Sequence, residues 1–154
     1  MFQKYYPVMK TKLFLFFSLF VSSTLFSQSV PEVKWTDLMD ITFKDIYLEK
    51  DDIYVYYPLF GEKQKKHDGQ TIQITGYMIP IDVEQNQYVL SAFPFSACFF
   101  CGNAGPESVM AVYFQGNTRQ YNTDERIKLE GTLELNDTDV DELVYVLRNA
   151  SEKP

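Results

Sequence analysis

Side chains that commonly bind metals or act in catalysis are scarce in this sequence. His67 is its only histidine, and Cys98 and Cys101 are its only cysteines. A complete structural zinc site takes four ligands, commonly two Cys-x-x-Cys pairs, so a single pair does not complete one. The sequence also shows no glycine-rich phosphate loop, no serine triad and no clear acid–base pair. These absences argue against the familiar enzyme classes and favour a non-enzymatic protein.

Basic residues are also few. The chain has 14 Lys and Arg against 21 Asp and Glu, a net charge of −7. Three of the cations, Lys4, Lys10 and Lys12, stand near the N-terminus, and without them 11 cations face 21 anions, a net charge near −10. Nucleic-acid affinity depends on Lys and Arg that neutralise phosphates, so we expect no nucleic-acid partner. Cations would be attracted.

The long apolar run, Leu13 to Phe26, is about 14 residues and too short to span a bilayer as a helix. Basic residues precede this run, and a polar stretch with small residues follows at Ser27. This order predicts a signal peptide over residues 1–28, with cleavage near Ser27 or Gln28. We expect a periplasmic or secreted protein that meets the membrane only through this transient segment.

The remaining chain divides into an aromatic, acidic N-terminal lead-in over residues 29–69 and a β-rich part over residues 70–150. The lead-in fits a short helical turn followed by a strand. Alternating or continuous apolar positions then predict five strands. They cover residues 70–82, 88–93, 109–114, 126–135 and 143–147, and a polar tail follows the last.

Five such strands predict a mostly β protein, a small OB-like Greek-key barrel with an N-terminal extension. A short β-sandwich would give a similar pattern. In the first strand, Ile72 and Ile74 have one parity, whereas Tyr77, Ile79 and Ile81 have the other. Gly76 stands at this change of phase, which predicts a bulge or sharp bend there.

An acidic turn precedes the last predicted strand. It contains Asp137, Asp139, Asp141 and Glu142. These residues lack the central glycine and the ligand spacing of an EF-hand, so we expect a solvated turn rather than a calcium site.

Cys98 and Cys101 carry the most specific local signal. Two thiols three residues apart can form a disulfide, bind one soft metal ion or act as a redox couple. Glu107 or His67 is a candidate third ligand for a metal. Thioredoxin-like motifs precede a helix, whereas here glycines and a β-like segment follow, so redox catalysis is the weakest alternative. Covalent haem attachment is disfavoured, because Gly102 stands where a histidine is needed.

Three stretches resemble a family of small exported bacterial proteins that carry domain of unknown function 3299. They are GYMIP (76–80), YVLSAFPFSAC (88–98) and CGNAGPESVM (101–110). The resemblance covers residues 33–150 and implies an OB-like fold. Some members are associated with operons for transition-metal transport, zinc above all, which implies metal-transport components as partners. In one branch a histidine stands two positions after the equivalent of Cys98, where this chain has Phe100.

These observations lead to a first hypothesis and two alternatives. The first is an exported, non-enzymatic accessory protein that binds Zn²⁺ or Cu⁺ through Cys98 and Cys101, with Glu107 or His67 as a further ligand. The second is a binding or scaffold domain in which a Cys98–Cys101 disulfide fixes a loop. The third is a thiol–disulfide oxidoreductase.

Overall fold

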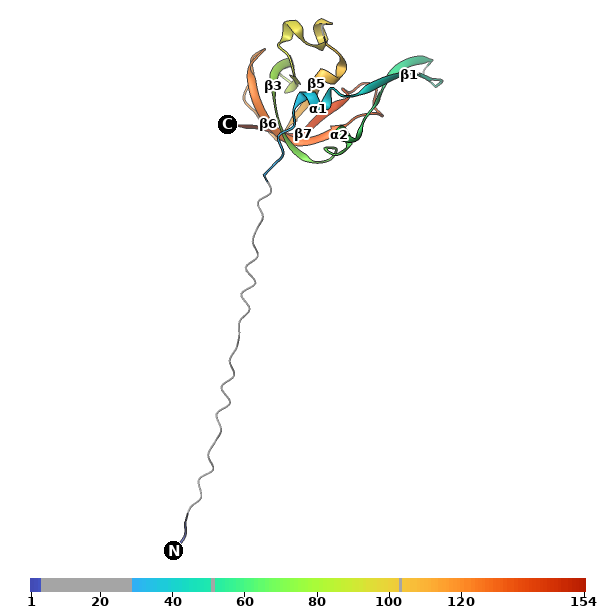
Figure 1. Ribbon diagram of the computed structural model, residues 1–154. Helices are drawn as coiled ribbons and strands as arrows, with labels where there is room; N and C mark the ends of the chain where they lie inside the picture. The colour runs from blue at the N-terminus through green and yellow to red at the C-terminus, as the bar shows by residue number, and fades with distance from the viewer. Residues whose placement is uncertain (4–28, 51, 103) are drawn as a thin grey trace.

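The computed structural model describes residues 1–3, 29–50, 52–102 and 104–154. The predicted signal peptide therefore lies, except for its first residues, outside the described part of the chain. Figure 1 shows a β-barrel with a two-stranded arm, β1–β2, that extends away from it. No helix within the described residues is long and apolar enough to cross a membrane.

Five strands close into the barrel in the order β3-β4-β5-β7-β6, and β6 pairs again with β3. All pairs are antiparallel except β5 with β7. In chain order this is the strand arrangement 1-2-3-5-4 of an OB-like barrel, which confirms the predicted fold and excludes the sandwich. The elements are α1 (Trp35–Leu38), β1 (Thr42–Leu48), β2 (Ile53–Leu59), α2 (Glu62–Lys65), β3 (Thr71–Asp82), β4 (Gln87–Ser91), η1 (Phe95–Ala97), η2 (Phe99–Cys101), η3 (Pro106–Ser108), β5 (Val109–Phe114), β6 (Arg126–Leu135) and β7 (Tyr145–Lys153).

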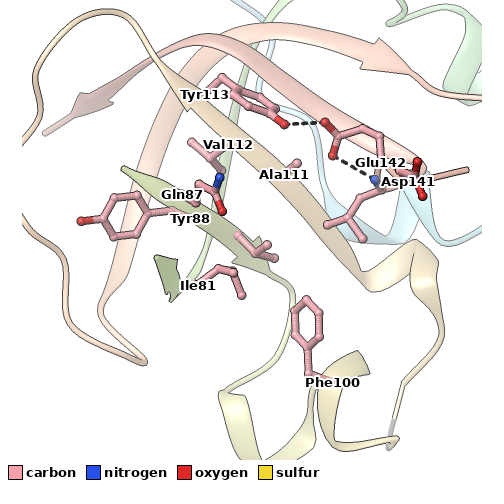
Figure 2. Close-up of a pocket in the computed structure, with 11 residues that line it drawn as sticks. Ile81, Gln87, Tyr88, Phe100, Ala111, Val112, Tyr113, Asp141 and Glu142 are labelled. Carbon is pink, nitrogen blue, oxygen red and sulfur yellow. Dashed lines mark hydrogen bonds between the residues drawn. The ribbon is translucent and has the colours of Figure 1, made fainter. Parts of the chain in front are cut away.

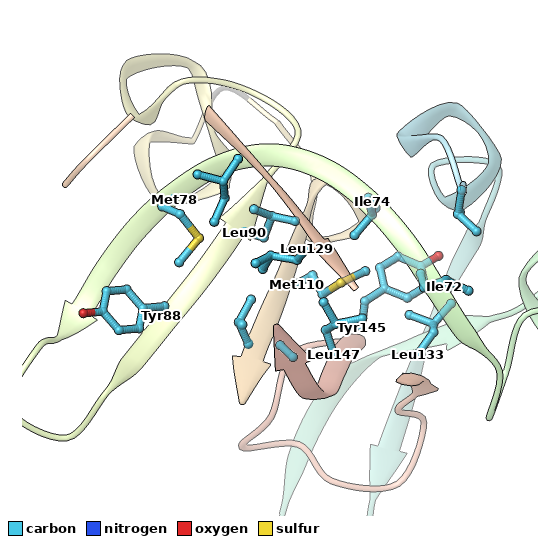
Figure 3. Close-up of a cluster of buried hydrophobic side chains, with 14 of the residues drawn as sticks. Ile72, Ile74, Met78, Tyr88, Leu90, Met110, Leu129, Leu133, Tyr145 and Leu147 are labelled. Carbon is cyan, nitrogen blue, oxygen red and sulfur yellow. The ribbon is translucent and has the colours of Figure 1, made fainter. Parts of the chain in front are cut away.

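The barrel interior is filled by alternate apolar residues of all five strands (Figure 3). On β3, Ile72, Ile74 and Met78 are fully buried, so one parity faces the interior along almost the whole strand. The opposite parity is buried at Ile79, which belongs to a second cluster outside the barrel. The apparent change of phase in the sequence therefore reflects burial on both faces of β3.

Of the two features predicted at Gly76, a bulge or a sharp bend, the bulge is wrong. Residues 71–77 of β3 pair with β6 without a shift, and the irregularity in β3 lies between Pro80 and Asp82 instead. A Cβ at Gly76 would lie 2.6 Å from the Ser91 carbonyl oxygen and 2.8 Å from Leu90 Cγ. Glycine is needed here because β4 approaches the β3 backbone too closely for a side chain.

The last strand is longer than predicted. The sequence placed a strand at 143–147 and a polar tail after it, whereas β7 runs from Tyr145 to Lys153. Asn149 has a φ of 52°, and the pairing with β6 shifts beside it. This bulge lets β7 continue although its apolar alternation is interrupted.

The lead-in packs on the barrel as a short helix, an arm and a second short helix. Leu38 of α1 is fully buried in the core, and its carbonyl oxygen accepts a hydrogen bond of 2.6 Å from the buried Tyr145 hydroxyl. The buried Gln64 amide of α2 donates to the carbonyl oxygens of Asp37 and Asp40, each at 2.8 Å. These bonds satisfy backbone groups that α1 leaves open at its C-terminal end. They fix the base of the β1–β2 arm against the barrel.

Candidate functional site

The segment between β4 and β5 carries both cysteines and covers part of the outer face of the barrel. It consists of three short 3₁₀ turns, η1 to η3. Cys98 packs with Ile79, Val89 and Val109, which project outward from β3, β4 and β5. Because this cluster is buried, the segment forms an outer layer on these strands.

The two cysteines meet within this layer. Cys98 is fully buried and Cys101 is exposed; both are free thiols, and they are near enough for Cys98 to influence the pKa of Cys101. The turn between them is held by a bond of 3.2 Å from the Cys101 amide to the Cys98 carbonyl, and Gly102 ends it with a φ of 71°. This left-handed conformation, which glycine adopts at low cost, ends the turn and changes the direction of the chain after Cys101.

The electrostatic setting of Cys101 disfavours its thiolate. Desolvation raises the pKa of this thiol, and the neighbouring Cys98 raises it further. Reactive cysteines of disulfide oxidoreductases instead have lowered pKa values, commonly at the N-terminus of a long helix. Here the surrounding helix, η2, has only three residues. The arrangement suits a stable thiol pair or disulfide better than a nucleophile.

The structure does not bring His67 or Glu107 to the thiols. His67 lies beside Thr71 at the start of β3, whereas Cys98 packs on Ile79 near the other end. Thr71 and Ile79 are eight residues apart, which is about 26 Å along an extended strand.

Glu107 folds back over Gly105, where an added Cβ would meet its carboxylate oxygens. It faces Tyr145, whose pKa is raised by burial and then by the Glu107 charge. Within the described ranges, no three His, Cys, Asp or Glu side chains converge to hold a metal ion. Metal binding by these residues stays a prediction.

A hollow of about 350 Å³ lies on the outer face of β4 and β5, beside the cysteine segment. We call it the strand-face hollow. Its lining is Ile81, Gln87, Tyr88, Val89, Phe100, Ala111, Val112, Tyr113, Asp141, Glu142 and Leu143. Figure 2 shows Phe100 rising from the cysteine segment toward the strands, with Tyr113 and Glu142 joined by a hydrogen bond across the hollow from it. One wall thus comes from Phe100, one of the two residues between the cysteines.

The structure is similar to a solved structure of a DUF3299 family protein from Pseudomonas aeruginosa PAO1. The TM-score is 0.51, and the match covers 82% of this chain and 98% of that one at 11% sequence identity. The two proteins share a fold. No family model matches the sequence, and the search of curated proteins found no match. The resemblance to the DUF3299 family is thus confirmed at the level of the fold.

Sequence reasoning missed the strand-face hollow, although one signal for it was present. In β5, Met110 and Val112 face the barrel, yet the outward residues Val109 and Ala111 are also apolar and buried. A strand that is apolar on both faces is covered on both. The sequence could therefore have predicted an outer layer on β4 and β5, but not that Phe100 would complete a hollow there.

Proposed function

We propose that this protein is an exported, non-enzymatic binding module. Its ligand lies in the strand-face hollow, and the Cys98–Cys101 pair fastens the segment that forms one wall. The position of the hollow carries this proposal. In OB folds, the face of the second and third strands and the loop before the last strand bind extended polymers. Here these elements are β4, β5 and the loop that contributes Asp141, Glu142 and Leu143.

The surface around the hollow supports a binding role. Ile81, Phe100 and Tyr113 are exposed by 53%, 45% and 43%, although all three are large and apolar or aromatic. Exposed apolar side chains that gather beside a concavity are typical of ligand or partner sites. Asp141 and Glu142 at its edge disfavour phosphate-rich ligands. Export is supported by the N-terminal sequence alone.

The thiol pair has a structural role in this proposal. An exported protein meets an oxidising environment, in which neighbouring cysteines form disulfides. A Cys98–Cys101 disulfide would close the short turn that carries Phe100. It would therefore hold Phe100 at the wall of the hollow.

An uncharged apolar dye tests the binding face. We expect Nile red to fluoresce on binding the oxidised protein and to shift the amide NMR signals of β4, β5 and residues 95–108. Ala111→Gln should reduce the fluorescence at least fivefold, because Ala111 lies on the outer face and a longer polar side chain would occupy the hollow. The matched control is Tyr54→Ser, an exposed aromatic residue outside the hollow, which should bind as the wild type does. Equal binding by wild type and Ala111→Gln would rule this face out.

A soft metal on the thiol pair is the second candidate, supported by the short turn that holds both cysteines and by the exposure of Cys101. Two thiolates suffice for Cu⁺ more readily than for Zn²⁺, which takes four ligands. Native mass spectrometry of the reduced protein with each metal, beside Cys98→Ser, tests it. One bound equivalent that the variant lacks would favour the metal. A mass lower by about 2 Da without reductant, and no uptake with it, would favour the disulfide.

A further inference from the structure

A second hollow, of about 420 Å³, lies between the β1–β2 arm and the loop that precedes β7. We call it the arm hollow. In the arm, directly paired residues share a face, and Ile46 pairs with Val55 while Leu48 pairs with Ile53. Ile53, Val55 and Tyr57 of this face line the arm hollow, and Tyr56 and Pro58 of the opposite parity also reach it. A two-stranded ribbon with an open apolar face gains stability when another chain covers that face.

The acidic turn 137–142 separates the two hollows, and Asp141 and Glu142 line both. The buried Asn136 side chain holds this turn in place. It donates a hydrogen bond of 2.7 Å to the Asp139 carbonyl and accepts bonds from the amides of Thr138 and Asp139. The turn is therefore a fixed crest between two apolar depressions, rather than only a solvated loop.

The charged side chains that line the two hollows are all acidic. The residues that line the two hollows include Asp137, Asp139, Asp141 and Glu142, and none is Lys, Arg or His. No ion pair of the described residues involves this turn. Two cations lie beside it: Arg148 stacks on the Tyr113 ring at 4.4 Å and is already paired with Glu134 at 2.9 Å, and Lys44 lies opposite Tyr57 in the arm.

The four carboxylates differ in how far they are engaged. Asp137 accepts a hydrogen bond from Tyr57, Glu142 from Tyr113, and Asp139 from the Asp141 amide. The Asp141 carboxylate accepts none from any described residue and stands exposed on the crest. It is thus available to a cation that lies across the crest.

We propose that the two hollows and the crest form one groove for an extended, basic segment of a partner protein. Apolar side chains of the segment fill the hollows, and a Lys or Arg between them pairs with Asp141. Tyr57 adds an aromatic ring at the arm side, where a cation also binds favourably. The proposal rests on the strand-face hollow being a binding face, and it adds the ligand class and the arm. A second copy of this acidic chain is disfavoured by charge, since each carries −7.

Fluorescence anisotropy tests the groove with a short peptide of alternating leucine and lysine that carries an uncharged dye. The same peptide with glutamate in place of lysine is the first control. We expect saturable binding of the lysine peptide that weakens at least tenfold in Asp141→Lys. Glu49→Lys makes the same change of charge at the tip of the arm and should weaken binding less than twofold. Both residues are exposed, so the variants should fold, which circular dichroism and the urea midpoint check.

Three outcomes would overturn the proposal. The first is equal binding of the glutamate and the lysine peptide. The second is an equal loss of peptide binding in Asp141→Lys and Glu49→Lys. The third is a dimer, detected by sedimentation velocity, that dissociates when Val55→Asp places a charge on the apolar face of the arm. Nile red separates this proposal from the one above. If the dye binds the strand-face hollow but the peptide does not bind, only the basic partner is wrong. If neither binds, both proposals fail.

Discussion

Oxidation of Cys98 and Cys101 should stabilise the protein measurably. A disulfide here closes a ring of four residues. The chain-entropy relation gives about 2 kcal/mol for a ring of that size. The two cysteines are neighbours in one short turn, and Cys98 is already buried against Ile79, Val89 and Val109, so closure asks for little rearrangement. We therefore expect most of this gain to appear as a higher free energy of unfolding in the oxidised protein.

Urea unfolding with and without reductant measures the effect, and Cys101→Ser is the matched control. Cys101 is exposed, so serine adds no buried polar group. The variant should unfold at the midpoint of the reduced wild type and should not respond to reductant. If the oxidised wild type unfolds at the same urea concentration as the reduced form, or at a lower one, the disulfide does not stabilise this segment and the proposed role of the pair is refuted.

Three further changes test the framework that positions the site. Gly76→Ala should cost about 1–3 kcal/mol in urea unfolding, because the new Cβ meets the Ser91 backbone; a loss below 0.5 kcal/mol would contradict the close approach. Tyr145→Phe should cost about 1–3 kcal/mol by leaving the buried Leu38 carbonyl without this donor, and unchanged stability would contradict it. Arg119 lowers the pKa values of Glu125 and Glu152, so the ionised carboxylates stabilise the folded protein. This stabilisation is fully present above the unfolded pKa of about 4.3 and is lost as the pH falls through the lower pKa values of the folded protein. The loss of stability in Arg119→Met should therefore be larger at pH 7 than at pH 2, where only the contact of Arg119 with the Tyr121 ring is still lost; parallel pH curves of the two proteins would contradict the linkage.

The barrel itself could be predicted from the sequence because each of its strands has a regular pattern. Ile127, Leu129, Gly131 and Leu133 alternate along β6, and all four face the interior. Glycine at two inward positions, Gly76 and Gly131, also belongs to this pattern, since an added Cβ at either would meet the backbone of a neighbouring strand. Only the reason for Gly76 was wrong: a close strand approach and a bulge both call for glycine.

The arm and the end of β7 could not be predicted as reliably. Both faces of the arm carry apolar side chains, aliphatic around Ile46 and Val55 and aromatic around Tyr47 and Tyr54, so no alternation of apolar and polar residues marks its strands. In β7, Arg148 and Asn149 interrupt the apolar run where the strand bulges, and a polar tail is the simpler interpretation of that sequence. Local pattern is weak wherever a strand is solvated or irregular.

The candidate site lies where the strand pattern is least amphipathic. A bare OB-like barrel needs apolar residues on one parity of each strand, yet β5 is buried on both parities from Val109 to Val112. The cysteine segment accounts for Val109, Val89 and Ile79, which pack with Cys98. It leaves Ile81 and Tyr113 partly open beside Phe100, around the strand-face hollow. Outward-facing apolar residues that the cysteine segment leaves uncovered are the residues that a ligand would bury. The same outward positions thus explain why the cysteine segment docks on these strands and why the proposed binding face lies next to it.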